Sequence, residues 1–331
     1  MDLHHVALLA PEGARLSVAS PRIRSGFVTA ADGVRLYWRA VGEGPAIVCC
    51  NGVGVSIFFW KYVVQHYAPN HTVVLWDYRC HGRSDRPSLQ TAGPGGAVGD
   101  LAIERHAEDL RCVLDALELD QVMLIGHSMG CQVVFEFQRR HPARVLAMIP
   151  MLGSAGKTLE TFYDFKHSPA IFRALSAWLD GQGDRIHFVV RPLLESPLAW
   201  VLARKLSLVD PCYCKEEDLR PYIRHLATLD LRVFLHAVLA CQEHDAWSAL
   251  PQIRVPVLVV AAERDTFTPM WLSRKMVGLI RGADFLVLAE GSHAALIEQP
   301  ETIVHRIDRF LAERNVFGAA RADARMAMSA K

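Results

Sequence analysis

Short apolar runs that end in turn residues dominate the pattern of hydrophobic and polar positions along the chain. A run that is apolar throughout, instead of alternating, predicts a strand buried on both faces, as in a parallel sheet. Such strands are expected at residues 46–50, 72–76, 121–125, 145–151, 257–261 and 285–288. Two further β-rich segments, 27–29 and 35–39, flank Ala31-Asp32-Gly33 and predict a hairpin.

Helical periodicity fills the spaces between these strands. Apolar residues recur there at intervals of three and four, which is the spacing of one helix face. Helices are expected at residues 57–67, 104–117, 132–141, 269–279 and 300–314. An alternation of strand and helix along the chain indicates the α/β class.

One long stretch, residues 154–245, breaks this alternation. It contains no convincing strand, and it reads as several amphipathic helices rich in large apolar residues. Because it is too long for a connecting loop, we expect a helical insertion. Its aromatic residues Phe162, Phe165 and Trp178 are candidates to line a substrate pocket. The alternative is that they build only the core of the insertion itself.

Composition and charge exclude several classes of protein. The 331 residues are 51% apolar, which is enough to bury a large core and excludes general disorder. The formal net charge is +1, which gives no electrostatic reason to expect a nucleic acid or an anionic membrane as partner. No apolar run approaches the roughly 18–20 residues of a membrane span. Residues 1–16 lack the cationic start and long apolar core of a signal peptide, so we expect a cytoplasmic protein.

The cysteines and histidines do not suggest a metal site. The 8 cysteines fit a reducing compartment, and Cys212-Tyr213-Cys214 lacks the two-residue spacer and second pair of a zinc knuckle. The 15 histidines include no His-Glu-x-x-His pair, which argues against a zinc protease. No metal is therefore expected.

The most informative motif follows the strand at residues 121–125. Gly126-His127-Ser128-Met129-Gly130 is a Gly-x-Ser-x-Gly sequence between a predicted strand and a predicted helix. Neighbouring backbone crowds both glycine positions, and the sharp turn presents the hydroxyl of Ser128 at the carboxyl end of the sheet. Ser128 is therefore the candidate nucleophile.

A serine hydroxyl needs a base, and the base needs an acid that orients it. His293 follows the last predicted strand and precedes the last helix, so it is the candidate base. Asp265 lies just past the strand at residues 257–261 and is the candidate acid, with Glu263 as its competitor. His127 is adjacent to Ser128, but we expect its side chain to leave the turn in another direction.

An oxyanion that forms on a substrate needs hydrogen-bond donors. The strand at residues 46–50 ends in a turn in which Gly52 and Gly54 let the backbone approach a substrate oxygen. The N–H groups of Val53 and Met129 are the candidate donors.

These motifs resemble those of the α/β-hydrolase family over residues 26–311. The order Ser128, Asp265, His293 matches the family's order of nucleophile, acid and base. The resemblance implies an eight-stranded, mostly parallel sheet flanked by helices, with a helical cap inserted after the sixth strand. The expected organisation is an N-terminal extension at residues 1–22, a core at 23–153 and 246–315, a cap at 154–245 and a C-terminal tail at 316–331.

Three positions depart from the family pattern. Asn51 stands where members often have His, and this change bears on the polarity of the pocket. Cys80 replaces the usual Gly in the turn after the fourth strand, and Cys131 replaces a small residue after the nucleophile turn. Dehalogenases and epoxide hydrolases of the family use Asp as nucleophile, so Ser128 argues against both.

The resemblance implies hydrolysis of a carboxylic ester through an acyl-enzyme, with an apolar small-molecule substrate and no cofactor. Lactone or carbon–carbon bond hydrolysis uses the same triad and stays open. Cofactor-free peroxidase-like chemistry and acyl transfer also stay open. A further alternative is a binding protein that keeps the fold and has lost turnover. The natural substrate and the oligomeric state do not follow from the sequence.

Overall fold

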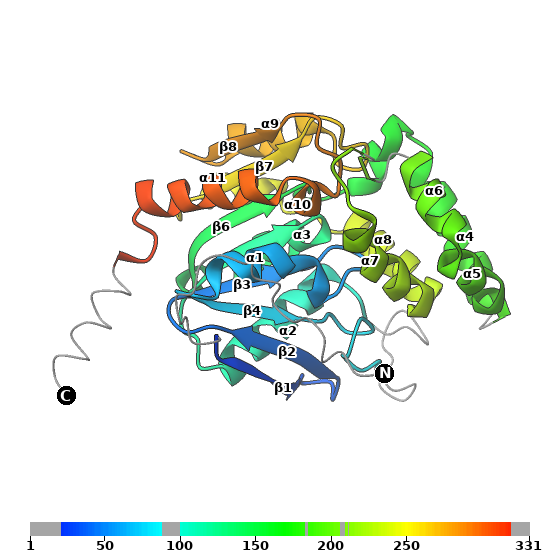
Figure 1. The fold of residues 1–331 in the computed structure, drawn as a ribbon, viewed down its shortest axis with the longest axis horizontal. Helices are drawn as coiled ribbons and strands as arrows, with labels where there is room; N and C mark the ends of the chain where they lie inside the picture. Colours follow the sequence, from blue (N-terminus) through cyan, green and yellow to red (C-terminus); the bar gives the residue numbers. More distant parts are fainter. Residues whose placement is uncertain (1–20, 88–99, 183–184, 206–208, 211, 319–331) are drawn as a thin grey trace, which may run out of the picture.

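Eight strands form one sheet at the centre of the molecule (Figure 1). The computed structural model describes residues 21–87, 100–182, 185–205, 209–210 and 212–318. The strands are β1 (Ile23–Thr29), β2 (Arg35–Val41), β3 (Ala46–Cys50), β4 (Thr72–Trp76), β5 (Val122–His127), β6 (Val145–Met151), β7 (Leu258–Ala262) and β8 (Asp284–Leu288). Their order is β1-β2-β4-β3-β5-β6-β7-β8. β2 pairs antiparallel with both β1 and β4, and the remaining pairs are parallel.

A hydrophobic core covers each face of the sheet, and this explains why the central strands are apolar throughout. Along β3, Ile47 and Cys49 belong to one core, whereas Val48 and Cys50 belong to the other. Successive side chains of a strand point to opposite faces, so a strand between two cores has no solvated side.

Five helices supply most of the cover. α1 (Lys61–Tyr67) and α11 (Pro300–Glu313) pack on one face, and α2 (Ile103–Ala116), α3 (Met129–Arg140) and α9 (Met270–Leu279) pack on the other. The 3₁₀ turn η1 (Ile57–Trp60) precedes α1, and the short helix α10 (Ala295–Glu298) precedes α11. The predicted eight-stranded, mostly parallel sheet flanked by helices is confirmed.

Some element boundaries differ from the sequence-based expectation. β1 begins at Ile23 instead of residue 27, because it pairs with β2 along its whole length while most of its side chains are exposed. An exposed edge strand leaves no hydrophobic pattern to detect. α3 begins at Met129 instead of residue 132, directly after the nucleophile turn. Residues 1–20 of the expected extension and residues 319–331 of the expected tail lie outside the described residues.

Helices fill the segment between β6 and β7. They are the 3₁₀ segment η4 (Thr158–Asp164) and the helices α4 (Ser168–Gln182), α5 (Arg185–Glu195), α6 (Pro197–Lys205), α7 (Glu216–Thr228) and α8 (Leu231–Glu243), followed by the 3₁₀ turn η5 (Trp247–Gln252). An isolated antiparallel bridge between Gly156 and Asp245 brings the two ends of the insertion together. In Figure 1, α7 and α8 lie next to the sheet, and α4, α5 and α6 form an outer layer at the edge of the molecule. Within the described residues, no helix has the length and apolarity needed to cross a membrane.

Candidate active site

Ser128 occupies the sharp turn between β5 and α3. Its φ of 55° and ψ of −118° are strained for a residue with a side chain. A Cβ on Gly126 would lie 2.4 Å from the Gly130 carbonyl oxygen, and one on Gly130 would lie 2.1 Å from the Cys50 carbonyl oxygen. Both positions therefore require glycine, and the turn holds the Ser128 hydroxyl above the end of the sheet.

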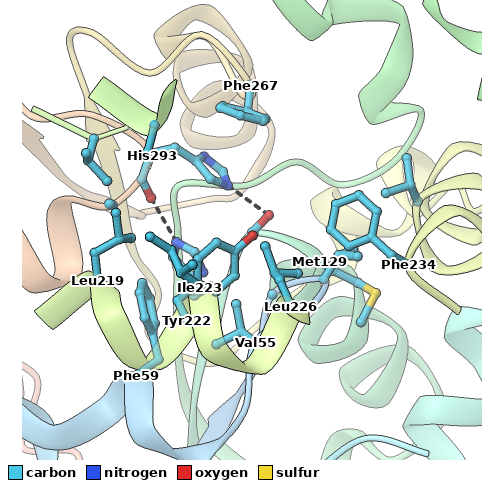
Figure 2. Close-up of a pocket in the computed structure, with 18 of the residues that line it drawn as sticks. Val55, Phe59, Met129, Leu219, Tyr222, Ile223, Leu226, Phe234, Phe267 and His293 are labelled. Carbon is cyan, nitrogen blue, oxygen red and sulfur yellow. Dashed lines mark hydrogen bonds between the residues drawn. The ribbon is translucent and has the colours of Figure 1, made fainter. Parts of the chain in front are cut away.

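The structure brings Ser128, His293 and Asp265 together, although they lie far apart in the sequence. The Nε2 atom of His293 is 3.0 Å from Ser128 Oγ (Figure 2), and its Nδ1 atom is 2.9 Å from Asp265 Oδ2. The Phe267 ring stacks on the imidazole with centroids 4.8 Å apart. With Nδ1–H bonded to the carboxylate, Nε2 is free to accept the proton of Ser128.

The surroundings of Asp265 keep its carboxylate ionised. Its side chain is fully buried, and burial alone would raise its pKa. His293 and the hydrogen bonds from His293 and Thr268 outweigh burial and hold the pKa of Asp265 below its usual value. Oδ1 accepts the N–H groups of Phe267 and Thr268, both at 2.9 Å, and Oδ2 also accepts the Thr268 hydroxyl at 2.8 Å. Glu263, the competing acid, instead accepts the N–H of Glu290 at the surface.

Two residues that line the cavity together with Ser128 have unpaired backbone N–H groups in the described structure. Val53 and Met129 both line the cavity at Ser128, and neither N–H donates a hydrogen bond to another described residue. A Cβ on Gly52 would lie 3.0 Å from His127 Nδ1 and 3.2 Å from Ser128 Cβ, so the Val53 turn packs closely against the nucleophile turn. Unpaired N–H groups beside a nucleophile can stabilise an oxyanion.

A cavity of about 380 Å³ opens above these groups, between the sheet and the inserted helices. Its wall comes from both parts: Phe59, Phe267 and Ala294 lie on the sheet side, and Phe162, Tyr222 and Phe234 come from the insertion. No Asp, Glu, Lys or Arg is among the described residues that line it. Figure 2 shows Tyr222, Ile223 and Leu226 of α7 arranged along one side of the cavity and Phe234 of α8 on another.

Comparison with known proteins places this architecture in a family. A family model described as the alpha/beta hydrolase fold matches residues 45–300. The chain belongs to the α/β-hydrolase family. A protein of Azorhizobium caulinodans named "Putative carbamate hydrolase RutD" is 25% identical over 84% of this chain and 95% of its own length.

Solved structures agree with this α/β-hydrolase fold. An esterase from Exiguobacterium antarcticum superposes with a TM-score of 0.66 at 19% identity, over 86% of this chain and 98% of that one. The enol-lactonase from Burkholderia xenovorans LB400 gives 0.68 at 21% identity, over 87% of this chain and 100% of that one. At these identities the superpositions establish the fold.

The departures from the α/β-hydrolase pattern have structural roles. Asn51 does not line the cavity, so the expected effect of this change on the polarity of the pocket is not seen. The amide of Asn51 donates to the Trp76 carbonyl at 2.7 Å and accepts from Trp60 Nε1 at 2.7 Å, so both of its polar atoms are hydrogen-bonded within the protein. Cys80 adopts a φ of 65°, the conformation that usually selects glycine. The Cys131 thiol is buried against the Gly126 carbonyl at 3.3 Å.

The sequence interpretation gave His127 no role, but its side chain lies at the site. Its Nε2 atom is 3.0 Å from the carbonyl oxygen of His293, and its ring lies 5.1 Å from the His293 ring. Burial, reinforced by the charge of His293, lowers the pKa of His127 to about 3, so its imidazole is neutral. It also lines the cavity. Its position next to Ser128 was the available indication.

Of the three aromatic residues expected to line the pocket, the structure places only Phe162 there. The prediction was wrong for Phe165 and Trp178, which are half exposed and lie outside the cavity wall. Non-helical backbone at Phe162 and Tyr163 redirects the chain before Phe165. On α4, helical spacing turns Trp178 about 120° away from the cavity-lining Phe172.

No cluster of three or more His, Cys, Asp or Glu side chains among the described residues is arranged to hold a metal ion. Cys212 is exposed and Cys214 is buried, and both are free thiols.

Proposed function

We propose that this α/β-hydrolase is a serine hydrolase that cleaves carboxylic esters through an acyl-enzyme intermediate. The observation that carries the proposal is the continuous contact from Asp265 to His293 to Ser128, with Ser128 at the wall of an apolar cavity. A hydroxyl bonded to a base that is itself oriented by a carboxylate is an activated nucleophile.

In the first half-reaction, Ser128 Oγ attacks the ester carbonyl carbon while His293 Nε2 takes its proton. The imidazolium that forms is stabilised by the buried Asp265 carboxylate, which stays ionised. The N–H groups of Val53 and Met129 stabilise the oxyanion, and each such donor contributes about 2.7–4 kcal/mol. The tetrahedral intermediate then collapses, and His293 gives its proton to the leaving alkoxide.

In the second half-reaction, water replaces the alcohol. His293 takes a proton from the water, the resulting hydroxide attacks the acyl carbon, and the same two N–H groups hold the new oxyanion. His293 returns the proton to Ser128 Oγ as the carboxylic acid leaves. His127 supports both steps by holding the His293 backbone carbonyl, and its own ring is neutral.

The cavity favours a neutral, apolar ester. Its wall carries no charged side chain among the described residues, and a carboxylate on the substrate would lose its hydration without gaining an ionic partner. The helices of residues 154–245 form one side of the wall, so we propose that they act as a cap on a core made of residues 23–153 and 246–315. Phe162 contributes from this cap, together with Tyr222 and Phe234.

Labelling with an organophosphonate and turnover of a p-nitrophenyl ester test the proposal together. Ser128→Ala should abolish labelling and leave only the weak residual rate that the oxyanion donors and binding supply. Ser273→Ala is the matched control, since this buried hydroxyl has no hydrogen-bond partner in the described structure. Undiminished labelling of Ser128→Ala refutes the assignment. A panel of linear esters and lactones of equal carbon number then separates ester from lactone hydrolysis.

A further inference from the structure

The outer layer of inserted helices carries a concentration of exposed apolar side chains. Of the fifteen large hydrophobic side chains exposed in the described residues, nine lie on α4, α5 and α6. On α4, Ile171, Leu175 and Trp178 are exposed and recur at intervals of four and three residues, so they form one stripe along the helix. Polar residues normally occupy this position on a solvent-facing helix.

α5 and α6 are apolar on both sides. Leu194 and Ala203 line the cavity from within, whereas Phe188 and Val189 are 79% and 70% exposed and Leu198 is also exposed. A helix that is hydrophobic all round is typical of an element covered on all sides. The protein itself covers one side only, and the outer side faces solvent.

The outer apolar surface continues into the cavity. Leu193 of α5 and Leu202 of α6 both line the cavity, yet they are 46% and 43% exposed. These two side chains join the cavity wall to the outside of the molecule.

The charges beside this surface are mainly positive. α6 ends in Arg204 and Lys205, both exposed, and Arg191 of α5 pairs with Glu195 at 2.9 Å. The described side chains of these two helices thus carry three cations and one carboxylate. The net charge of +1 for the whole chain conceals this local excess. On a lipid surface, cations of this kind bind anionic headgroups while the neighbouring apolar side chains contact the acyl chains.

We propose that the outer face of α4, α5 and α6 docks on a lipid surface with anionic headgroups. Phe188, Val189 and Leu198 enter the acyl region, while Arg204 and Lys205 meet the headgroups. An apolar substrate then leaves the lipid past Leu193 and Leu202. A second copy of the chain on this face would bring the same cations toward one another, which like-charge repulsion disfavours.

Flotation with phospholipid vesicles tests this surface. The Ser128→Ala chain is used so that no lipid is consumed, and the vesicles contain phosphatidylcholine alone or mixed with phosphatidylglycerol. The triple substitution Phe188→Gln, Val189→Gln and Leu198→Gln should lower partitioning by at least about a hundredfold, because three apolar anchors are lost. Glutamine is a good helix former, and unfolding monitored by circular dichroism checks that the variant is folded.

Two further variants sharpen the test. Ile23→Gln combined with Trp271→Gln removes two exposed apolar side chains outside the insertion and should leave partitioning unchanged. Arg204→Gln combined with Lys205→Gln should remove the preference for phosphatidylglycerol, which we expect to be about tenfold or more, and leave binding to pure phosphatidylcholine intact.

Equal partitioning of the parent chain and the triple variant overturns the proposal, as does the absence of vesicle binding by the parent. A dimer in light scattering that the triple substitution dissociates would assign the face to a second copy instead. Binding is measured without turnover, so failure of ester hydrolysis is distinguishable: an active esterase that ignores vesicles refutes the docking surface alone.

Discussion

Replacement of Asp265 by Asn tests whether this side chain orients His293. An amide that keeps its oxygen on the N–H groups of Phe267 and Thr268, where Oδ1 now accepts at 2.9 Å, places its NH₂ group against His293. Nδ1 of His293 must then accept a hydrogen bond instead of donating one. The ring proton moves to Nε2, which faces Ser128 Oγ at 3.0 Å and can no longer accept its proton.

The opposite orientation of the amide is disfavoured. It would leave the two buried N–H groups of Phe267 and Thr268 without an acceptor, at a cost of about 1–3 kcal/mol each. We therefore expect kcat to fall by roughly 10³–10⁴, which corresponds to about 4–5.5 kcal/mol of lost transition-state stabilisation. KM should change little, since Asp265 does not line the cavity.

Initial rates on one p-nitrophenyl ester, with kcat and KM separated, measure the effect. Glu263→Gln is the matched control, because this carboxylate contacts the N–H of Glu290 and not His293. Thermal unfolding verifies that both variants are folded. An Asp265→Asn enzyme within tenfold of the parent, or loss of activity in Glu263→Gln, would show that the wrong acid has been assigned.

Three further outcomes are expected. Gly130→Ala forces a Cβ to within 2.1 Å of a β3 carbonyl oxygen and should lower the free energy of unfolding, measured by urea titration, by at least about 3 kcal/mol. Gly278→Ala has open space around it and should raise the free energy of unfolding by about 0.5–1 kcal/mol. Equal effects of the two substitutions would contradict the turn geometry. Phe162→Ala should reduce kcat/KM for bulky esters more than for acetate esters, and Phe165→Ala, outside the cavity, should leave both kcat/KM values unchanged. A larger loss in Phe165→Ala than in Phe162→Ala would place the pocket elsewhere. Because the folded pKa of Asp265 lies below its unfolded value, its carboxylate contributes stability that is present above the unfolded pKa and is lost as pH falls through the folded one. Stability of the parent should therefore fall more steeply below about pH 4 than that of Asp265→Asn, and parallel curves would contradict the shift.

The sheet was predictable because its signal is local. β3 through β7 are short apolar runs buried between two cores, and this burial leaves a continuous pattern in the sequence. β8 is half-buried at the edge of the sheet but is also a short apolar run. β1 was located only in part, since pairing through the backbone with β2 fixes it while its side chains stay exposed.

The positions of Ser128, Asp265 and His293 also followed from the sequence. Each lies in the turn or loop that follows a parallel strand, and the carboxyl ends of parallel strands meet at one edge of the sheet. The choice between Asp265 and Glu263 rested on a weaker argument. In the structure the hydrogen bonds of the two carboxylates distinguish them, because Asp265 contacts His293 whereas Glu263 accepts the N–H of Glu290.

The sequence by itself determined the strands, the nucleophile turn and the helical nature of residues 154–245. Only the tertiary structure decided which faces of the inserted helices meet the cavity. Helices α4, α5 and α6 are apolar on more than one side, so periodicity could not distinguish Phe172 of α4, which lines the cavity, from Trp178, which does not. The kink at Tyr163 and the packing of α4 on α8 set those directions, and both depend on contacts between residues distant in the chain.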